Sequence, residues 1–294
     1  MDKRTIVTSI TTSTFVVLLL YFFLPSNFFR HSNTGQDVES QYKKIQETKT
    51  LRAAYYPGAP LFQIDPNTKR KSGIFYEIVE SAAGKLGLKV EWTEEVGYGE
   101  MIEGLNQRRY DIFGAGVWLN ASRGARADFS IPVYYDAVYA YSRKDDYRFD
   151  DNLSIIDSPK YTISTMDGEL GANIAKTDFP HASTAQIPQA ADWSQLILNV
   201  INNKADVVFL ALAPAREYQN ANPDKIRSIN NQPVRVFPVS LLIRKGEYEL
   251  KQSLDAALIE MLTNGEIEKI IQKNEKIHGS FLRTQLPYRD IKDK

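Results

Sequence analysis

Apolar residues recur along this chain at intervals that predict alternating strands and helices. Short apolar runs are typical of buried strands, and apolar residues three or four positions apart are typical of a helix with one buried face. The predicted strands lie at residues 51–56, 90–92, 110–117, 161–164, 206–210 and 239–243. The predicted helices lie at residues 74–86, 101–106, 194–202, 249–262 and 267–272. This alternation predicts an α/β fold whose ligand sites lie beyond the carboxyl ends of the strands.

The amino-terminal segment has the pattern of an export signal. Residues 6–24 carry no charged side chain, and Lys3 and Arg4 precede them. About 19 uncharged residues can cross a bilayer as a helix, and the two basic residues favour a cytoplasmic amino terminus. A cleaved signal peptide is the alternative, because the continuously apolar part is only residues 15–24. Since no small-residue cleavage site follows Leu24, we expect a retained anchor, with the remainder of the chain on the periplasmic or extracytoplasmic face.

Composition excludes several classes of site. The 294 residues contain 36 basic and 36 acidic side chains, so bulk charge gives no reason to expect a nucleic-acid partner. There is no cysteine, which excludes disulfides, a lipid-modified cysteine anchor, zinc thiolate sites and cysteine nucleophiles. The 3 histidines are scattered along the sequence and do not suggest a metal site. We therefore expect no cofactor.

One segment carries most of the candidate chemistry. Asp111-Ile-Phe-Gly-Ala-Gly-Val-Trp-Leu-Asn-Ala-Ser-Arg123 reads as a buried strand that ends in small residues, followed by a turn that presents an arginine. A second turn, rich in aromatic residues, follows in Asp128-Phe-Ser-Ile-Pro-Val-Tyr-Tyr135. A guanidinium at a strand end can bind a carboxylate with two parallel hydrogen bonds. Pairing of Arg123 with a neighbouring acid of the protein is the alternative that these residues leave open.

With these residues the chain resembles the extracellular solute-binding proteins of family 3, which serve polar amino-acid importers. The resemblance covers residues 51–275. Its most specific motif is matched by Asp111, Gly116, Arg123, Asp128-Phe-Ser130, Pro132 and Tyr134. Further matches are Gly73, Glu77, Ser240-Leu-Leu-Ile-Arg-Lys-Gly246 and Asn264-Gly-Glu-Ile-Glu-Lys-Ile270.

The resemblance implies a two-lobed periplasmic binding protein type II fold with two crossover strands, preceded by the amino-terminal signal or transmembrane helix. The boundaries that we expect are a signal segment at 1–26, a linker at 27–49, lobe 1 at 50–140 and 238–280, lobe 2 at 141–237, and a tail at 281–294. It also implies a monomeric binding protein, not an enzyme, that delivers a small carboxylate or amino-acid-like ligand to the membrane permease of an ABC transporter.

The same resemblance implies roles for individual residues. Arg123 would bind the α-carboxylate of the ligand, and Gly116 would offer backbone groups nearby. Tyr98 would form an aromatic wall against the ligand, although an aromatic that covers a helix start is an equal alternative.

Several departures from the family pattern bear on the ligand. Trp118 and Asn120, both of which we expect to contact the ligand, replace hydroxyl residues near the arginine, and Ala59 replaces an aromatic residue in the first turn. Ala211 stands where amino-acid binders place the acid that holds the ligand ammonium, and a buried ammonium without that partner is costly. Glu169 is a candidate replacement for that acid, and an acid at a helix start is its alternative interpretation. Trp118 and Tyr98 together could wall a flat or cationic ligand.

Two other functions remain open at this point. One is a ligand-sensing module whose binding pocket has diverged. The other is a dehydratase-like enzyme on the same fold, in which Glu169 would act as a general acid. No pair of carboxylates at a recognisable catalytic spacing supports the enzyme, so we expect a binding protein.

Overall fold

A computed structural model describes residues 41–188 and 192–284. All described residues belong to one compact unit, which begins at Gln41. The expected signal anchor at residues 6–24 lies outside the described residues. Within the described part of the chain, no helix is long and apolar enough to cross a membrane.

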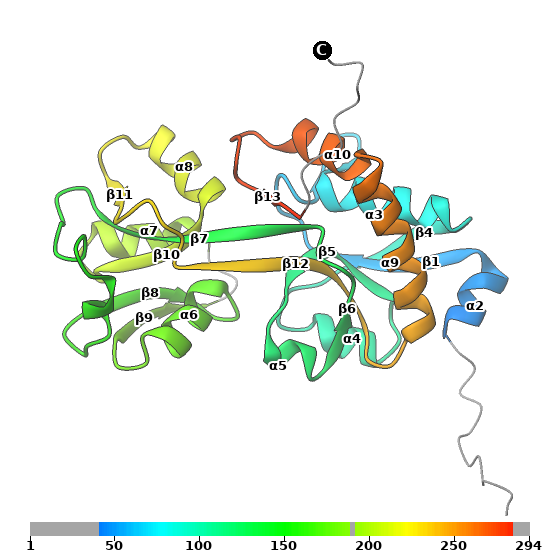
Figure 1. Cartoon of the computed structure of the whole chain (residues 1–294), viewed down its shortest axis with the longest axis horizontal. Coiled ribbons are helices and arrows are strands. Elements are labelled where there is room, and N and C mark those ends of the chain that lie inside the picture. The colour runs from blue at the N-terminus through cyan, green and yellow to red at the C-terminus, as the bar shows by residue number, and fades with distance from the viewer. Residues whose placement is uncertain (1–40, 189–191, 285–294) are drawn as a thin grey trace, which may run out of the picture. The chain divides into compact units, whose positions relative to one another are not determined.

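The order of elements follows the alternation predicted from the sequence (Figure 1). The helices are α2 (Gln41–Thr48), α3 (Ile74–Lys85), α4 (Met101–Asn106), α5 (Ala121–Gly124), η1 (Leu153–Ile156), α6 (Leu170–Asp178), α7 (Ser194–Ile201), α8 (Leu212–Ala221), α9 (Tyr248–Thr263) and α10 (Glu266–Asn274). The strands are β1 (Thr50–Tyr55), β2 (Gln63–Ile64), β3 (Lys71–Ser72), β4 (Lys89–Glu95), β5 (Ile112–Trp118), β6 (Ala127–Phe129), β7 (Tyr134–Arg143), β8 (Thr162–Met166), β9 (Ser183–Ile187), β10 (Val207–Ala211), β11 (Ile226–Ser228), β12 (Arg235–Arg244) and β13 (Leu282–Arg283).

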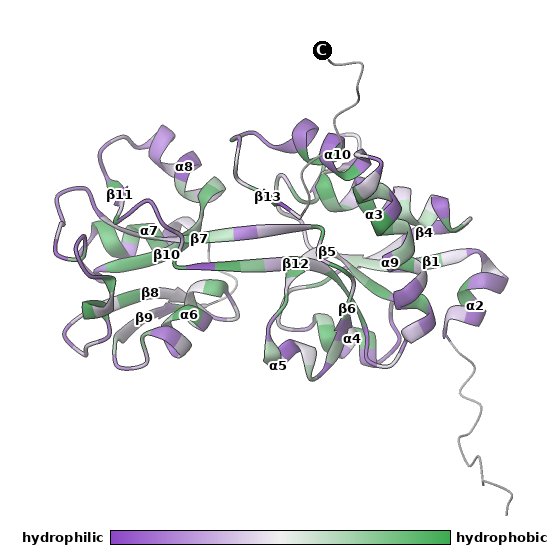
Figure 2. Cartoon of the chain, viewed as in Figure 1, coloured by the Kyte–Doolittle hydropathy of each residue, from purple (hydrophilic) through white to green (hydrophobic). Residues whose placement is uncertain are grey.

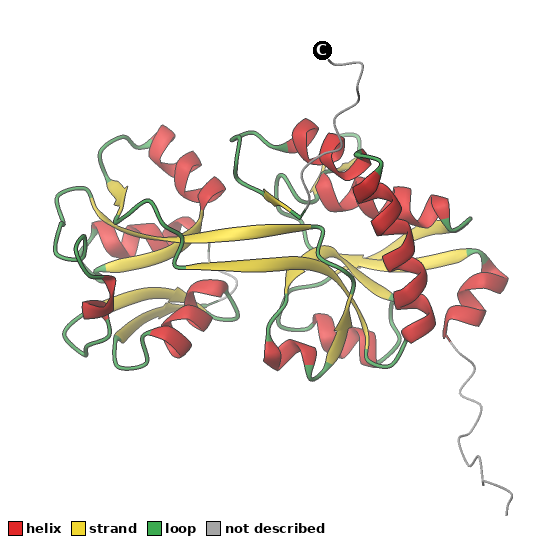
Figure 3. Ribbon diagram, viewed as in Figure 1, coloured by secondary structure: helices red, strands yellow, loops and turns green. Residues whose placement is uncertain are grey.

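Two parallel groups of strands flank a central antiparallel pair. The main path through the large sheet is β4-β1-β5-β12-β7-β10-β8-β9. On one side β1 runs parallel to β4 and β5, and on the other β8 runs parallel to β9 and β10. The long strands β7 and β12 pair antiparallel from Val239↔Tyr134 to Arg235↔Val138, and they stand out as the two longest arrows in Figure 3. The predicted α/β fold with two crossover strands is confirmed.

Buried side chains form separate cores on the two sides of this pair, and we call the parts around them lobe 1 and lobe 2. The largest core of lobe 1 lies around β1, α3 and α9 and includes Leu51, Ile74 and Leu254. The main core of lobe 2 includes Ile163, Ile174 and Val207. Helices α3, α9 and α10 each carry hydrophobic and hydrophilic residues along the same ribbon, which is the pattern of a helix with one buried face (Figure 2).

The change from one lobe to the other falls near the middle of the β7–β12 pair. Tyr134 and Val239 belong to the core of lobe 1, whereas Val138 and Phe237 belong to the core of lobe 2. This point comes slightly earlier in β7 than the expected boundary at residue 140. Asp136 lies between the two cores and is opposite Phe237 in the register of the strands.

Strand β5 contains an irregularity that shapes its carboxyl end. Its pairing with β12 shifts between Ser240↔Val117 and Leu242↔Phe113, so β5 has extra residues at this point, as in a β-bulge. Gly116 lies there with φ +63°, a left-handed conformation that favours glycine. A Cβ atom at this position would lie 2.2 Å from the ring of Phe75, so packing requires glycine as well.

Both ends of the described chain pack onto lobe 1. In the expected linker, α2 buries Ile45, and the side-chain amide of Gln41 donates a 2.8 Å hydrogen bond to the buried Asp111. Arg52 also pairs with Asp111 at 2.7 Å, which ties α2 and β1 to the start of β5. In the expected tail, β13 pairs with β7 and extends the sheet. The folded region is therefore longer at each end than the sequence suggested.

Candidate functional site

A cavity of about 430 Å³ lies beside the central strands and is lined by residues of both lobes. We call it the central cavity. Lobe 1 contributes Trp118 at the end of β5, and lobe 2 contributes residues of β8, α6 and β10. Its aromatic lining residues are Tyr56, Trp118, Tyr134, Trp193, Phe209 and Phe281. The size and the apolar walls with a few polar groups are typical of a small-molecule site.

Asp136 is the most unusual polar group in the lining. Its side chain is on β7, where only 7% of the residue is exposed. The indole Nε1 of Trp118 donates a 2.6 Å hydrogen bond to Oδ2 of Asp136. Among the described residues no cation pairs with this carboxyl group, and burial raises its pKa to about 7 against the opposing effect of the Trp118 hydrogen bond. Burial without a neighbouring cation disfavours the ionised form of a carboxyl group.

Arg123 lies next to this cavity and joins the two lobes. Asn120 caps the short helix α5 by accepting a 2.9 Å hydrogen bond from the backbone N–H of Arg123. The guanidinium donates to the carbonyl oxygen of Trp118 at 3.1 Å and to that of Gly168, in lobe 2, at 3.3 Å. None of the described carboxylates forms an ion pair with Arg123. Burial lowers the pKa of the guanidinium, and the charge of Glu169 opposes that effect.

Glu169 lines the central cavity at the start of α6. It is the residue before the first turn of that helix, but its side chain makes no capping hydrogen bond. Burial raises the pKa of its carboxyl group, while Arg123 and the backbone N–H of Leu170 act in the opposite direction. Glu169 therefore faces the cavity from lobe 2 as a second acid with a raised pKa.

Tyr98 packs against two of the aromatic side chains that line the cavity, Trp118 and Tyr56. Its ring is parallel to that of Trp118, with 6.4 Å between the ring centres and 12° between the planes. It also contacts Tyr56 at 4.9 Å, and its hydroxyl donates weakly to the carbonyl oxygens of Ala115 and Gly116 at 3.4 and 3.5 Å. Trp118 and Tyr56 line the cavity, and Tyr98 holds them in place without lining it itself.

The six candidate residues thus fall into two groups. Trp118 and Glu169 line the cavity, and Arg123 contacts the backbone beside both. Tyr98, Gly116 and Asn120 shape the strand and turn that present Trp118 and Arg123. The departures Ala59 and Ala211 are also found in the lining, which leaves those two positions of the cavity without a polar side chain.

Sequence reasoning did not identify Asp136 or Tyr134 as candidate site residues. Both lie on β7 and line the central cavity. The available signal was an acid in the apolar run Tyr134-Tyr-Asp-Ala-Val-Tyr-Ala-Tyr141, because a buried strand seldom contains a charged residue without a reason.

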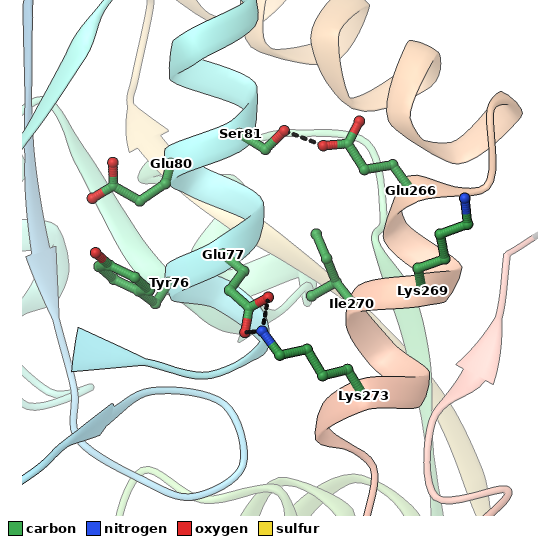
Figure 4. Close-up of a pocket in the computed structure, with 8 residues that line it drawn as sticks. All are labelled: Tyr76, Glu77, Glu80, Ser81, Glu266, Lys269, Ile270 and Lys273. Carbon is green, nitrogen blue, oxygen red and sulfur yellow. Dashed lines mark hydrogen bonds and ion pairs between the residues drawn. The ribbon is translucent and has the colours of Figure 1, made fainter. Parts of the chain in front are cut away.

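A second hollow, of about 610 Å³, lies between α3 and α10. Figure 4 shows two contacts that join the helices: Lys273 pairs with Glu77 at 2.9 Å, and the Ser81 hydroxyl donates to Glu266. Glu80 accepts a 2.8 Å hydrogen bond from the indole of Trp92. These groups join two helices of lobe 1, and the hollow lies outside the central cavity. We therefore place the candidate site in the central cavity.

Comparisons with known proteins agree with this architecture. The L-cystine-binding protein TcyA of Bacillus subtilis is 23% identical over 217 residues, which cover 73% of this chain and 76% of that protein. An ancestral amino acid-binding protein, a precursor of cyclohexadienyl dehydratase, has a TM-score of 0.66 at 22% identity and covers 81% of this chain and 100% of its own. The cysteine-binding protein of Campylobacter jejuni has a TM-score of 0.65 at 16% identity, and the match covers 81% of this chain and 93% of that protein.

The solved structures show the same two-lobed periplasmic binding protein type II fold. The pattern of the family described as bacterial extracellular solute-binding proteins, family 3, matches residues 51–275. That range covers most of the chain and both lobes of the described structure. The chain belongs to the bacterial extracellular solute-binding proteins of family 3.

Proposed function

We propose that this chain is the solute-binding component of an ABC-type importer, and that it binds a small amino-acid-like ligand in the central cavity. The observation that carries the proposal is the position of Arg123. Its guanidinium contacts both lobes through Trp118 and Gly168, and no described acid forms an ion pair with it. The family and its L-cystine-binding relative support an amino-acid-like ligand.

Arg123 is suited to hold a ligand carboxylate. Its partial burial removes water from the guanidinium, as the lowered pKa indicates, yet its present acceptors are two neutral carbonyl groups. A ligand carboxylate would supply the missing negative charge and accept two parallel hydrogen bonds. Binding at this point would also link lobe 1 to lobe 2 through the ligand.

Ligand binding would be coupled to closure of the lobes. The β7–β12 pair connects the two cores, and the cavity is lined from both sides of it. A ligand that touches both lobes binds the closed arrangement more tightly than the open one, and this difference in affinity sets how far it favours closure. We propose that a membrane permease recognises this closed form, and that the protein acts as a monomer on the extracytoplasmic face, anchored by residues 6–24.

Isothermal titration calorimetry tests the ligand class. The panel comprises the standard L-amino acids, L-cystine and small carboxylates without an amine, each titrated into the wild-type protein, Arg123→Ala and Arg126→Ala. Arg126 is an exposed arginine close in sequence and serves as the matched control. We expect at least one wild-type ligand whose affinity falls about a hundredfold in Arg123→Ala, because a buried charge pair is lost, and is unchanged in Arg126→Ala. Undiminished binding by Arg123→Ala would contradict the carboxylate role.

A further inference from the structure

The lining of the central cavity is acidic. It includes the carboxyl groups of Asp136, Glu169, Asp192 and Glu217, and among its described lining residues there is no lysine, arginine or histidine. Carboxylates gathered in a cavity with apolar walls create a negative potential that attracts cations. The aromatic walls add to this preference, because the face of an indole or phenol ring attracts a positive charge.

Asp136 is the acid in this lining that most lacks a partner. Oδ2 accepts the hydrogen bond from Trp118, whereas Oδ1 accepts none from the described residues. A carboxylate this deeply buried is normally paired with a cation or with several donors. Asp136 is opposite Phe237, between the cores of the two lobes, and its side chain is part of the cavity lining that both lobes share.

Tyr134 provides a second unpaired group beside it. The Tyr134 hydroxyl is buried and has no hydrogen-bond partner among the described residues. Residues two apart in a strand point to the same side, so Tyr134 and Asp136 face the cavity together. The ring of Tyr134 is fixed by an edge contact with Phe281, with 4.8 Å between the ring centres. Burial first, and then the charge of Asp136, raises the pKa of this hydroxyl.

The neighbouring strand explains why an acid is needed here. Ala211, which stands where the resemblance implies an ammonium-binding acid, pairs with Val138 in the register of β10 and β7. Asp136 is two residues before Val138 on β7, and both Ala211 and Asp136 line the cavity. The acid that is absent from β10 is therefore matched by one on the adjacent strand.

We propose that Asp136 Oδ1 and the Tyr134 hydroxyl form a subsite for an amine, and that the ligand is a small organic cation whose ammonium group binds between them. This inference rests on the proposed function and specifies the ligand of the same cavity. The amine donates to Oδ1 of Asp136, and the Tyr134 hydroxyl, which is covered in the ligand-free structure, becomes its second acceptor when the ligand binds. Trp118, through its hydrogen bond, holds the Asp136 carboxylate in position. A carboxylate at the other end of the ligand would bind Arg123.

Calorimetric titrations with five probes test this subsite. L-lysine and L-arginine carry both charges, cadaverine and agmatine carry amines without a carboxylate, and hexanoate carries a carboxylate without an amine. Each is titrated into the wild-type protein, Asp136→Asn, Tyr134→Phe and Asp145→Asn. Asp145 is an exposed acid just beyond the end of β7 and serves as the matched control. Thermal unfolding without ligand verifies that each variant folds.

For the wild-type protein we expect at least one amine probe to bind more tightly than hexanoate. Its affinity should fall about a hundredfold or more in Asp136→Asn and several-fold in Tyr134→Phe, with no change in Asp145→Asn. Tyr134→Phe removes only an unpaired hydroxyl, so it should fold as well as the wild type. Equal affinity of an amine probe for the wild-type protein and Asp136→Asn would overturn the subsite and leave the proposed function standing. If only hexanoate bound, or only neutral amino acids from the wider panel, the subsite would also be overturned and the proposed function would stand. Failure of every compound in both panels would overturn the proposed function itself.

Discussion

The indole of Trp118 donates a 2.6 Å hydrogen bond to the Asp136 carboxyl group and thereby connects the end of β5 to the beginning of β7. This contact joins a residue that the sequence marked as a departure from the family pattern to one that it did not mark at all. Since the described residues provide no cation for Asp136, the protonation of this carboxyl group depends on pH and on what occupies the cavity.

Asp136→Asn should stabilise the ligand-free protein at alkaline pH. Below the ordinary pKa of 3.8, Asp136 is protonated in both the folded and the unfolded chain. Between 3.8 and about 7, the folded chain keeps a proton that the unfolded chain loses, so wild-type stability falls as pH rises, and above about 7 it falls no further. The advantage of the neutral Asn variant in free energy of unfolding should grow by about 2 to 3 kcal/mol between pH 5 and pH 8.

Urea unfolding of both proteins at several pH values measures this difference. Asp145→Asn, with an exposed acid changed, should follow the wild-type curve at every pH. A constant difference between Asp136→Asn and the wild type would show that the carboxyl group does not titrate in this range.

Amine binding should weaken in acid. An ammonium group binds the ionised carboxylate, so below a pKa of about 7 the affinity should fall by about tenfold per pH unit. Glu169, Asp192 and Glu217 are the other acids of the lining, and Tyr98, Tyr134 and Arg123 are the titratable groups nearest to Asp136 and Glu169. The tyrosines remain protonated between pH 5 and 8, because burial raises their pKa values.

Titrations with cadaverine from pH 5 to pH 8 distinguish Asp136 from Glu169, the other lining acid whose pKa is raised by burial. The dependence should be lost in Asp136→Asn and retained in Glu169→Gln. If the pH dependence of cadaverine affinity disappears only in Glu169→Gln, the titrating group is Glu169 instead.

Gly116→Ala should destabilise the fold by about 2 kcal/mol or more. The added methyl would lie 2.2 Å from the Phe75 ring, and φ +63° is unfavourable for alanine. Gly124→Ala is the matched control, since a Cβ there meets nothing within 4 Å and its φ is ordinary. Chemical denaturation of the two variants compares them, and equal stability would contradict the packing role assigned to Gly116.

Asp111→Ala should cost about 3 kcal/mol of unfolding free energy. The substitution leaves the buried amide of Gln41 and the backbone N–H of Arg52 without their acceptor. Glu94→Ala removes the acid of a more exposed pair with Arg109, at 2.6 Å, and should cost less than about 1 kcal/mol. The two variants are compared by urea unfolding, and a similar small cost for both would mean that α2 and β1 do not depend on Asp111.

Local pattern was sufficient for helices α3, α4, α9 and α10 of lobe 1. Helix α3, for example, follows from the spacing of Ile74, Ile78 and Ala82, all of which are buried. Helix α8 was missed because it begins with Leu-Ala-Pro214 and buries only Ala215, so its sequence has little apolar periodicity. The full length of β7 was missed because both of its faces are covered, and its apolar run lacks the alternation of a half-exposed strand.

The residues of the candidate site were also only partly predictable from local sequence. Arg123 and Trp118 follow a recognisable strand and turn, so sequence reasoning found them. Asp136 depends on the pairing of β7 with β12 and β10, which brings residues from distant parts of the chain together. Gly116 and Asn120 were marked as possible ligand contacts, but backbone conformation and helix capping account for these residue types.

The pairing of β13 with β7 also affects how the protein should be handled. Ser280 and Phe281 line the central cavity, and Leu282 and Arg283 pair with Tyr135 and Tyr134, immediately before Asp136, in the register of the strands. A chain that is cut before residue 284 to attach an affinity tag, or cut at the end of α10, would lack part of the cavity wall. Most of both cores would remain intact. Such a protein could be soluble and still give a misleading negative result in every ligand screen.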